Sequence, residues 1–261
     1  IGYDVKLLQV DERVTVLERF QQLGVGAQPT NAEATRQASA IISLVTADQV
    51  LAAATETAQH LPKDALYLDM NSVAPDRKRA CAEVIARAGG RYVDVAIMAP
   101  VHPPRLSVPL LVSGPDAAGA ERMLSEIGFS NIRIVGAHIG DASTVKMVRS
   151  VMIKGIEALT AECFLAADAA GVTKDVLESL GGDWPDRANY NLDRMLVHGK
   201  RRAAEMEEVC ATLTSLGIDP LLTRGIVTRQ NALGSLNQGP TPETIDDKLA
   251  LMRTQQKASA A

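Results

Sequence analysis

Short apolar runs alternate with helix-compatible stretches in the first half of the chain. These runs predict strands over Val5–Val10, Ala40–Val45, Ala65–Leu68, Tyr92–Ala96, Val108–Val112 and Ile132–Val135. Capping-box patterns predict helix starts after Thr30 and Thr46, and Pro75 suits the first turn of another helix. Strands that alternate with helices are typical of a parallel sheet covered by helices.

The second half of the chain has a helical pattern throughout. Residues from Asp141 to about Ala170 contain neither proline nor a turn cluster, which predicts a helix of about 45 Å. Further helical stretches follow, and no strand pattern returns. We therefore predict an α/β domain over residues 1–138 and an all-α domain over residues 139–261. Apolar side chains on many faces of the long helix predict a homodimer built through the second domain.

The composition narrows the classes of partner. With 46% hydrophobic and 22% charged residues, the 261-residue chain resembles an ordinary globular protein. Its formal net charge of −4 disfavours binding to nucleic acid or to anionic membranes, which requires concentrated positive charge. Three widely spaced cysteines favour a reducing compartment over a disulfide framework or a zinc site. No apolar stretch approaches the ~20 residues of a bilayer span, so we expect a cytoplasmic protein that binds small molecules and no metal.

The opening residues fit the middle of a nucleotide-binding pattern. A Rossmann-type domain begins with a strand and a Gly-rich loop, and its second strand ends in an acid that binds the adenine ribose. The predicted strand Val5–Val10 ends at Asp11. We therefore expect the first strand and the Gly-rich loop to precede Ile1, and Asp11 to favour NAD slightly over NADP. Arg13 is the alternative, because a guanidinium can pair with the 2′-phosphate of NADP.

Lys146 is the candidate for proton transfer. It stands six residues after Gly140, in the first turns of the predicted long helix. A helix that follows the sheet can bring its first turns to the ligand crevice at the strand ends. An amine placed there can take or give the proton of a substrate hydroxyl group. Lys154, two turns further along, is expected to be dispensable.

Three segments carry a family resemblance. Gly140–Ser150 resembles a G-x-x-x-x-x-K-x-x-N-N element, Leu68–Pro75 resembles a D-x-S-T-x-x-P element, and Ile41–Thr46 resembles a turn that touches the cofactor. In this order, they make the chain resemble the β-hydroxyacid dehydrogenases of the 6-phosphogluconate dehydrogenase superfamily, in an uncharacterised branch with a divergent helical C-terminal domain.

This resemblance implies an activity and a set of site residues. It implies hydride transfer between NAD or NADP and the hydroxyl-bearing carbon of a small acid, with Lys146 as general acid/base. It also implies that Leu44 and Val45 contact the cofactor, and that the Ser72 hydroxyl lies on the nicotinamide side.

The substrate side departs from the family pattern. Met98 stands where serine and glycine amides usually hold the substrate carboxylate, and Arg149 and Ser150 replace two asparagines. Met98 and Ser150 are therefore the expected substrate-side residues at these positions. A later Lys-Asp pair, whose lysine approaches the cofactor in the family, aligns with Ala204-Glu205. The resemblance thus does not imply the usual short 3-hydroxyacid substrate.

Other side chains could complete a substrate site. His198 and Arg202 share a predicted helix face with Glu205, and a histidine with an arginine can bind a carboxylate or a phosphate. A solvated charged face is the alternative interpretation of this segment. His102 lies in a loop after a strand, where it could overhang the crevice, and Trp184 could line a substrate pocket or a subunit contact.

Three functions compete at this stage. A dehydrogenase of secondary alcohols that bear an acid group is the leading hypothesis. An imine reductase is the second, although Lys146 counts against it because imine reductases usually lack the lysine. A non-catalytic nucleotide-binding protein is the third, since the serine and asparagine positions of the family motif are altered.

Overall fold

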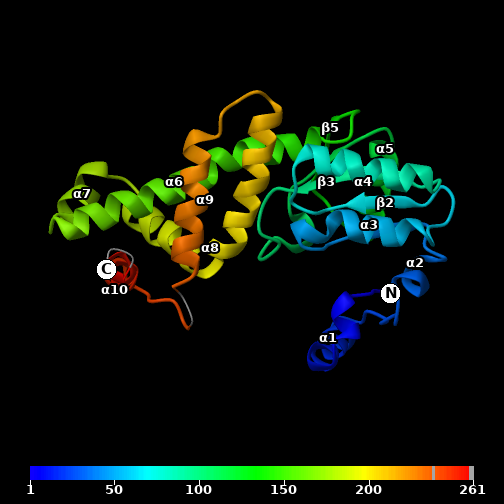
Figure 1. Cartoon of the computed structure of the whole chain (residues 1–261), viewed down its shortest axis with the longest axis horizontal. Coiled ribbons are helices and arrows are strands. Elements are labelled where there is room, and N and C mark those ends of the chain that lie inside the picture. Colours follow the sequence, from blue (N-terminus) through cyan, green and yellow to red (C-terminus); the bar gives the residue numbers. More distant parts are fainter. Residues whose placement is uncertain (237–238, 259–261) are drawn as a thin grey trace. The chain divides into compact units, whose positions relative to one another are not determined.

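A computed structural model describes residues 1–236 and 239–258 of the chain. The chain divides into two compact units, Ile1–Lys146 and Met147–Ala261, and the division falls within one long helix, α6 (Asp141–Ala169). Figure 1 shows strands and helices in the first unit and helices alone in the described part of the second.

The first unit is built on a five-stranded sheet in the order β1-β2-β3-β4-β5. Its strands are β1 (Ala40–Ser43), β2 (Leu66–Asp69), β3 (Arg91–Ile97), β4 (Leu110–Ser113) and β5 (Ile132–Gly136). The pairs β1–β2, β2–β3 and β4–β5 are parallel, whereas β3–β4 is antiparallel. The Rossmann-type sheet expected from the sequence is therefore confirmed, with one antiparallel pair that the sequence pattern did not reveal.

Alternating side chains send two apolar layers to opposite faces of the sheet. On one face, Leu66 and Leu68 pack with Leu124 of helix α5 (Ala117–Ile127). On the other face, Tyr67 and Tyr92 pack with helices α3 (Val50–Ala58) and α4 (Pro75–Arg87). This period of two is the expected consequence of the β pleat. Asp69 and Asp94 have the same parity as the two tyrosines, so they face the α3/α4 side.

The first predicted strand is wrong. Residues Val5–Leu8 form a 3₁₀ helix, η1, and α1 begins at Val10 and extends to Gln22. The Asp4 carboxylate caps η1 by accepting from the backbone N–H of Lys6 at 2.9 Å. Asp11 lies in the first turn of α1, where a carboxylate is favoured by the exposed N–H groups. These local hydrogen bonds and charges at the helix starts favour helix over the strand that the apolar pattern predicts.

A short helix, α2 (Asn31–Thr35), follows α1 and begins after Thr30, as its capping pattern predicts. The Thr30 hydroxyl accepts from the N–H of Glu33 at 3.2 Å and donates to its carboxylate at 2.9 Å. This is the predicted capping box. The second predicted box, at Thr46, makes no such side-chain cap, and a 3₁₀ turn, η2 (Ala47–Gln49), leads into α3.

The second unit contains most of α6 together with α7 (Thr173–Leu180), α8 (Trp184–Ser215), α9 (Leu221–Gly234) and α10 (Ile245–Ala258). Its core includes Phe164 from α6 and Met195 from α8, both fully buried. Helices α8 and α9 approach closely, because a Cβ on Gly199 would lie 2.6 Å from the Cα of Gly234. The prediction that the second domain is all-helical is confirmed for its described residues. No helix within the described ranges is both long and apolar enough to span a membrane.

A candidate cofactor and active site at the strand ends of the first unit

Strands β1, β2 and β3 are parallel, so their carboxyl ends meet at one edge of the sheet. The segments that leave this edge are Leu44–Val45, Met70–Ser72 and Met98, all predicted from the sequence as site segments or their neighbours. In an open α/β sheet, this edge is where nucleotide ligands bind. The first unit therefore brings Leu44, Val45, Ser72 and Met98 to one edge of the sheet.

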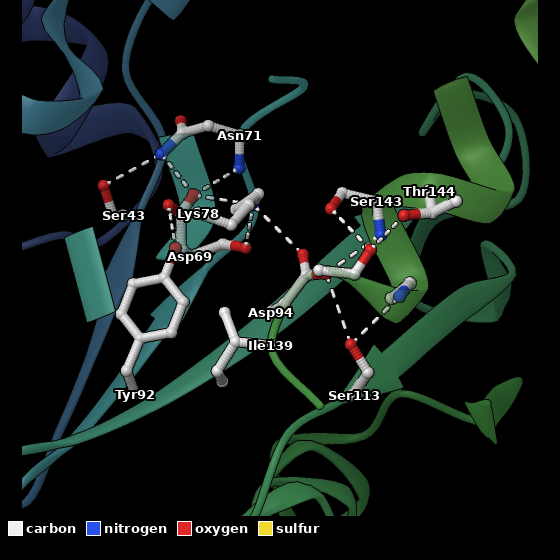
Figure 2. A network of polar contacts seen from close by, with 12 residues as sticks. Ser43, Asp69, Asn71, Lys78, Tyr92, Asp94, Ser113, Ile139, Ser143 and Thr144 are labelled. Carbon is white, nitrogen blue, oxygen red and sulfur yellow. Dashed lines mark hydrogen bonds and ion pairs between the residues drawn. The ribbon is translucent and has the colours of Figure 1, made fainter. Parts of the chain in front are cut away.

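Asn71 joins the first two of these loops. Its side-chain carbonyl accepts a hydrogen bond from the backbone N–H of Val45 at 2.6 Å, and its Nδ2 donates to the Ser43 hydroxyl at 3.1 Å. The loop after β1 is thus held by a side chain from the loop after β2. Figure 2 shows the Asn71 amide beside the Ser43 hydroxyl. Asn71 was missed in the sequence, where the motif drew attention to its neighbour Ser72.

Two features of these loops fit a dinucleotide. The side chains of Leu44 and Val45 are 66% and 40% exposed, which leaves an apolar surface directly after β1 for a ring or ribose to cover. The Ser72 Oγ is buried and has no hydrogen-bond partner among the described residues. A buried hydroxyl without a partner is costly in water-free surroundings. The residues present therefore fit a bound group that covers apolar atoms and reaches Ser72.

The start of α6 packs against the same part of the sheet. Gly140 has φ +104°, and a Cβ there would lie 3.0 Å from Pro75 Cβ, so a side chain would be strained on both counts. Ala142 packs with Ala96 of β3, and Met98 packs against the same cluster. Lys146 lies one turn after Ala142 and is partly buried. This geometry sets the first turns of α6 beside the end of β3.

Asp11 does not follow a strand, whereas Asp4 directly follows a short extended segment. Gly2 pairs with residues 26–28 in a parallel bridge, donating to Gly26 at 2.9 Å and accepting from Gln28 at 2.9 Å. Asp4 follows this extended segment directly and is half-buried. Asp11 is exposed on α1, so the strand-end position on which its assignment rested is not where it lies.

The candidate substrate residues of the second unit occupy different surroundings. Ser150 is buried on α6, and the Lys154 ammonium donates to its hydroxyl at 3.3 Å. The Arg202 guanidinium is buried against the Glu157 carboxylate, with Nε donating at 2.9 Å. An anionic substrate would have to compete with Glu157 for this group. The solvated-face interpretation is therefore wrong for Arg202, which is an interior residue.

The remaining sequence candidates lie nearer the surface. Burial lowers the pKa of His198, and the positive charges of Arg194, Arg201 and Arg202 lower it further. His102 is exposed in the loop after β3. Trp184 is half-buried at the start of α8, with the Arg187 guanidinium 4.9 Å from its ring centre. Within the described residues, no cluster of His, Cys, Asp and Glu has the arrangement of a metal site.

The sheet, its strand-end loops and the helical second unit define a nucleotide-binding α/β protein with an appended all-α domain. A model of the NAD binding domain of 6-phosphogluconate dehydrogenase matches residues 2–152, and a domain of unknown function, DUF1932, matches residues 167–233. The chain belongs to the family of that NAD binding domain, which confirms the resemblance drawn from its motifs. The class that follows is an NAD(P)-dependent oxidoreductase.

Solved structures agree with this assignment. A conserved hypothetical protein from Sinorhizobium meliloti is 34% identical, with 97% of this chain and 87% of that chain covered and a TM-score of 0.74. A conserved protein of unknown function, described as structurally similar to 3-hydroxyacid dehydrogenases, is 31% identical over 92% of this chain and 85% of that one, with a TM-score of 0.67. A 3-hydroxyisobutyrate dehydrogenase from Mycobacterium tuberculosis, 15% identical over 98% and 90% of the two chains with a TM-score of 0.72, shares the fold.

Proposed function

We propose that this protein transfers hydride between a nicotinamide cofactor and a secondary alcohol or ketone of a small acid, with Lys146 as general acid/base. The observation that carries the proposal is the position of Lys146 in the first turns of α6. The turn before it, at Ala142, packs with the end of β3 and with Met98. A side chain there can reach a substrate bound at the edge where strands β1 to β3 end.

The cofactor would be held by loop residues at this edge and by an acid from the start of the chain. Leu44 and Val45 would cover apolar parts of the dinucleotide, the Ser72 hydroxyl would find a hydrogen-bond partner on it, and Asp4 would accept from the adenine ribose hydroxyls. When bound, the nicotinamide ring supplies the hydride acceptor or donor. We propose Asp4 in place of Asp11, and NAD slightly ahead of NADP, because a carboxylate repels a 2′-phosphate.

Lys146 would hold or move one proton at the substrate hydroxyl oxygen. A neutral amine takes that proton as the alcohol becomes a ketone, and an ammonium returns it in reduction. Met98 stands where the family pattern has the serine and glycine that hold the substrate carboxylate, and Ser150 replaces an asparagine of the lysine motif. We propose both as substrate-side residues. Met98 offers no N–H or O–H side-chain donor, so the substrate differs from those held by a serine and glycine clamp.

The deciding experiment uses the full-length protein. NADH and NADPH binding are measured by fluorescence titration, and turnover is followed as cofactor reduction across a panel of hydroxyacids of increasing length. Cyclic imines with reduced cofactor form a separate arm for the imine reductase alternative. Turnover of a hydroxyacid that Lys146→Ala abolishes supports the proposal. Cofactor binding without turnover on any panel member, or turnover of imines alone, contradicts it.

A further inference from the structure

Lys78 is a lysine with no exposed surface, enclosed between two carboxylates from neighbouring strands. Its ammonium donates to Asp69 Oδ1 at 2.9 Å and to the backbone carbonyl of Asp69 at 2.7 Å, and lies 3.4 Å from Asp94 Oδ1. Lys78 lies on α4, and Figure 2 shows its side chain between Asp69 of β2 and Asp94 of β3. A buried ammonium is unfavourable unless its partners compensate for the lost hydration, and Lys78 has a carboxylate on each side.

On one side of Lys78, the network holds the loops at the proposed cofactor site. Asp69 Oδ1 accepts from the backbone N–H of Asn71 at 2.9 Å and from its Nδ2 at 2.7 Å. Asn71 in turn accepts from the N–H of Val45 at 2.6 Å. The Tyr92 hydroxyl donates to the second oxygen of Asp69 at 2.5 Å. Burial, reinforced by the Asp69 charge, raises the pKa of Tyr92 well above its usual value, so this hydroxyl stays a donor.

On the other side, the network holds the first turn of α6. Asp94 Oδ2 accepts from the backbone N–H of Ser143 at 2.9 Å and from the Ser113 hydroxyl at 3.2 Å. The same hydroxyl oxygen accepts from the N–H of Ala142 at 2.9 Å. First-turn amides have no partner within their own helix, and a carboxylate at this end is favoured by the helix dipole. Two of these amides are therefore held by side chains of the sheet, Asp94 from β3 and Ser113 from β4.

We propose that Lys78 is a positioning residue that couples the cofactor loops to the start of the helix that carries Lys146. Its single ammonium is shared by Asp69, which shapes the Asn71–Val45 contact, and by Asp94, which fixes the first turn of α6. Lys78, Asp69, Asp94 and Ser113 are fully buried, so water cannot replace a broken contact among them at low cost. The inference rests on the proposed function for the role of Lys146. The link between the two segments rests only on the contacts described above. Lys78 touches neither cofactor nor substrate.

The test measures backbone hydrogen exchange in the full-length protein, which requires no substrate. Lys78→Met removes the charge at similar volume. It deletes the hydrogen bonds to Asp69 and the ion pair with Asp94, so it should speed exchange about tenfold in residues 43–46 and 141–146 together. Asp94→Asn keeps one acceptor oxygen but turns a donor towards Lys78 or Ser143. It should fold, and should speed exchange only in residues 141–146. Lys248→Met is the matched control, since Lys248 is equally buried but bonds Asn189 and Asp193 in the second unit.

NADH supplies the second readout. Binding to the unmodified protein should slow exchange in residues 141–146 as well as in residues 43–46, and Lys78→Met should abolish the first effect while retaining the second. On the reaction, Asp94→Asn should lower kcat about tenfold with an unchanged Kd for NADH, a split that a loss of stability alone does not produce.

Two results would overturn the coupling. One is a uniform rise in exchange across the first unit in Lys78→Met, including β4 and α5, and the other is unchanged exchange in residues 141–146 in Asp94→Asn. Failure of the proposed function would look different: the protein would bind no nicotinamide cofactor, or would bind it without turning over a hydroxyacid. The exchange pattern of the variants without cofactor would still decide whether Lys78 links the two segments.

Discussion

The Lys154 ammonium lies 3.0 Å from the Glu205 carboxylate, and this ion pair joins α6 to α8 inside the second unit. The Lys154 side chain is 8% exposed and that of Glu205 is 17% exposed. Burial lowers the pKa of Lys154, although Glu205 raises it in opposition. Lys154 is therefore an interior residue whose replacement should affect stability, and its dispensability for turnover stays a prediction.

Removing Glu205 should be more harmful than removing Lys154. Glu205→Ala leaves a buried ammonium without its carboxylate, which costs about 3–5 kcal/mol of unfolding free energy. Lys154→Met removes the ammonium itself, and Glu205 retains Arg201 at 2.8 Å, so the loss should be smaller. Urea unfolding at pH 7 of both single variants and the double variant measures this order. Lys174→Ala, at an exposed position on α7, is the control. Equal losses in the two single variants would contradict the expectation.

The buried thiol of Cys81 predicts a loss of stability at alkaline pH. Burial, the largest cause, raises its pKa from the usual 9.0 to about 11. The folded state keeps the proton longer than the unfolded state, so this contribution is complete below pH 9 and is lost as the pH rises towards 11. Its size is on the order of 2–3 kcal/mol. Burial also raises the pKa values of Tyr67 and Tyr92, which act in the same direction.

Urea unfolding between pH 7.5 and 11, in reductant, tests the Cys81 contribution. Cys81→Ala should show a weaker decline over pH 9–11 than the unmodified protein, with an additional loss that is independent of pH from the missing sulfur. Cys163→Ala, at an exposed thiol, should follow the unmodified protein. Parallel pH curves for Cys81→Ala and the unmodified protein would refute the assignment.

The spacing of apolar residues was sufficient to predict the elements that bury one or two faces in a core. Strands β1 to β5 and the long helix were predicted within a few residues, because their apolar runs are bounded by turn residues and a packed core rewards the correct period. The strand over Val5–Val10 failed where no such core exists, since Val5, Leu8 and Val10 are all more than half exposed. There the Asp4 cap decided the structure.

The candidate site was predictable in its motifs and not in its buried partners. Ser72 and Lys146 come from recognisable patterns, but Lys78 looks like one charged residue of a solvated helix, in the run Asp76-Arg77-Lys78-Arg79. Its burial depends on Asp69 and Asp94, which lie opposite each other on neighbouring strands and face the same side of the sheet. The sequence around Lys78 does not contain this tertiary relationship. Arg202 was misjudged in the same way, because Glu157 lies 45 residues earlier in the chain.

Asp4, rather than Asp11, should set the preference for the cofactor. If its carboxylate accepts from the adenine ribose hydroxyls, Asp4→Ala should weaken NADH binding by about tenfold, the value of one or two charge-assisted hydrogen bonds, and should affect NADPH less. Asp11→Ala should leave both affinities within about twofold, since Asp11 is exposed on α1. Fluorescence titrations of the two variants measure this. A stronger effect from Asp11 would restore the original assignment, and an unmodified protein with a strong NADPH preference would favour Arg13.

The exposed stripe on α6 should be an interface between two copies of the chain. Val148, Met152 and Leu159 lie within about 40° of one another around the helix axis at 100° per residue. Their exposed fractions are 45%, 64% and 68%. Large apolar side chains grouped in this way mark an association surface. Light scattering at micromolar concentration should show a dimer, and Leu159→Glu should give monomers. A monomeric unmodified protein would contradict the predicted homodimer.

Lys146 should be required for the chemical step and not for cofactor binding. Hydride leaves a carbinol carbon readily only as the hydroxyl loses its proton, and positioned acid/base assistance contributes about 10²–10⁴ in rate. Lys146→Ala should therefore lower kcat by about that factor, with the Kd for NADH nearly unchanged. Lys146→Arg should not restore activity, because a guanidinium stays protonated and cannot accept the proton.

Comparison with Lys174→Ala, which alters an exposed lysine of the second unit, separates this effect from a general loss of positive charge. The pH dependence of kcat/KM gives a second test, since removing the acid/base group should remove one limb of the profile. If Lys146→Ala keeps near-normal turnover on the true substrate, the proton must move through another group. His198 on α8 and His102 after β3 are then the residues to replace, because the sequence made both of them candidates for substrate contact.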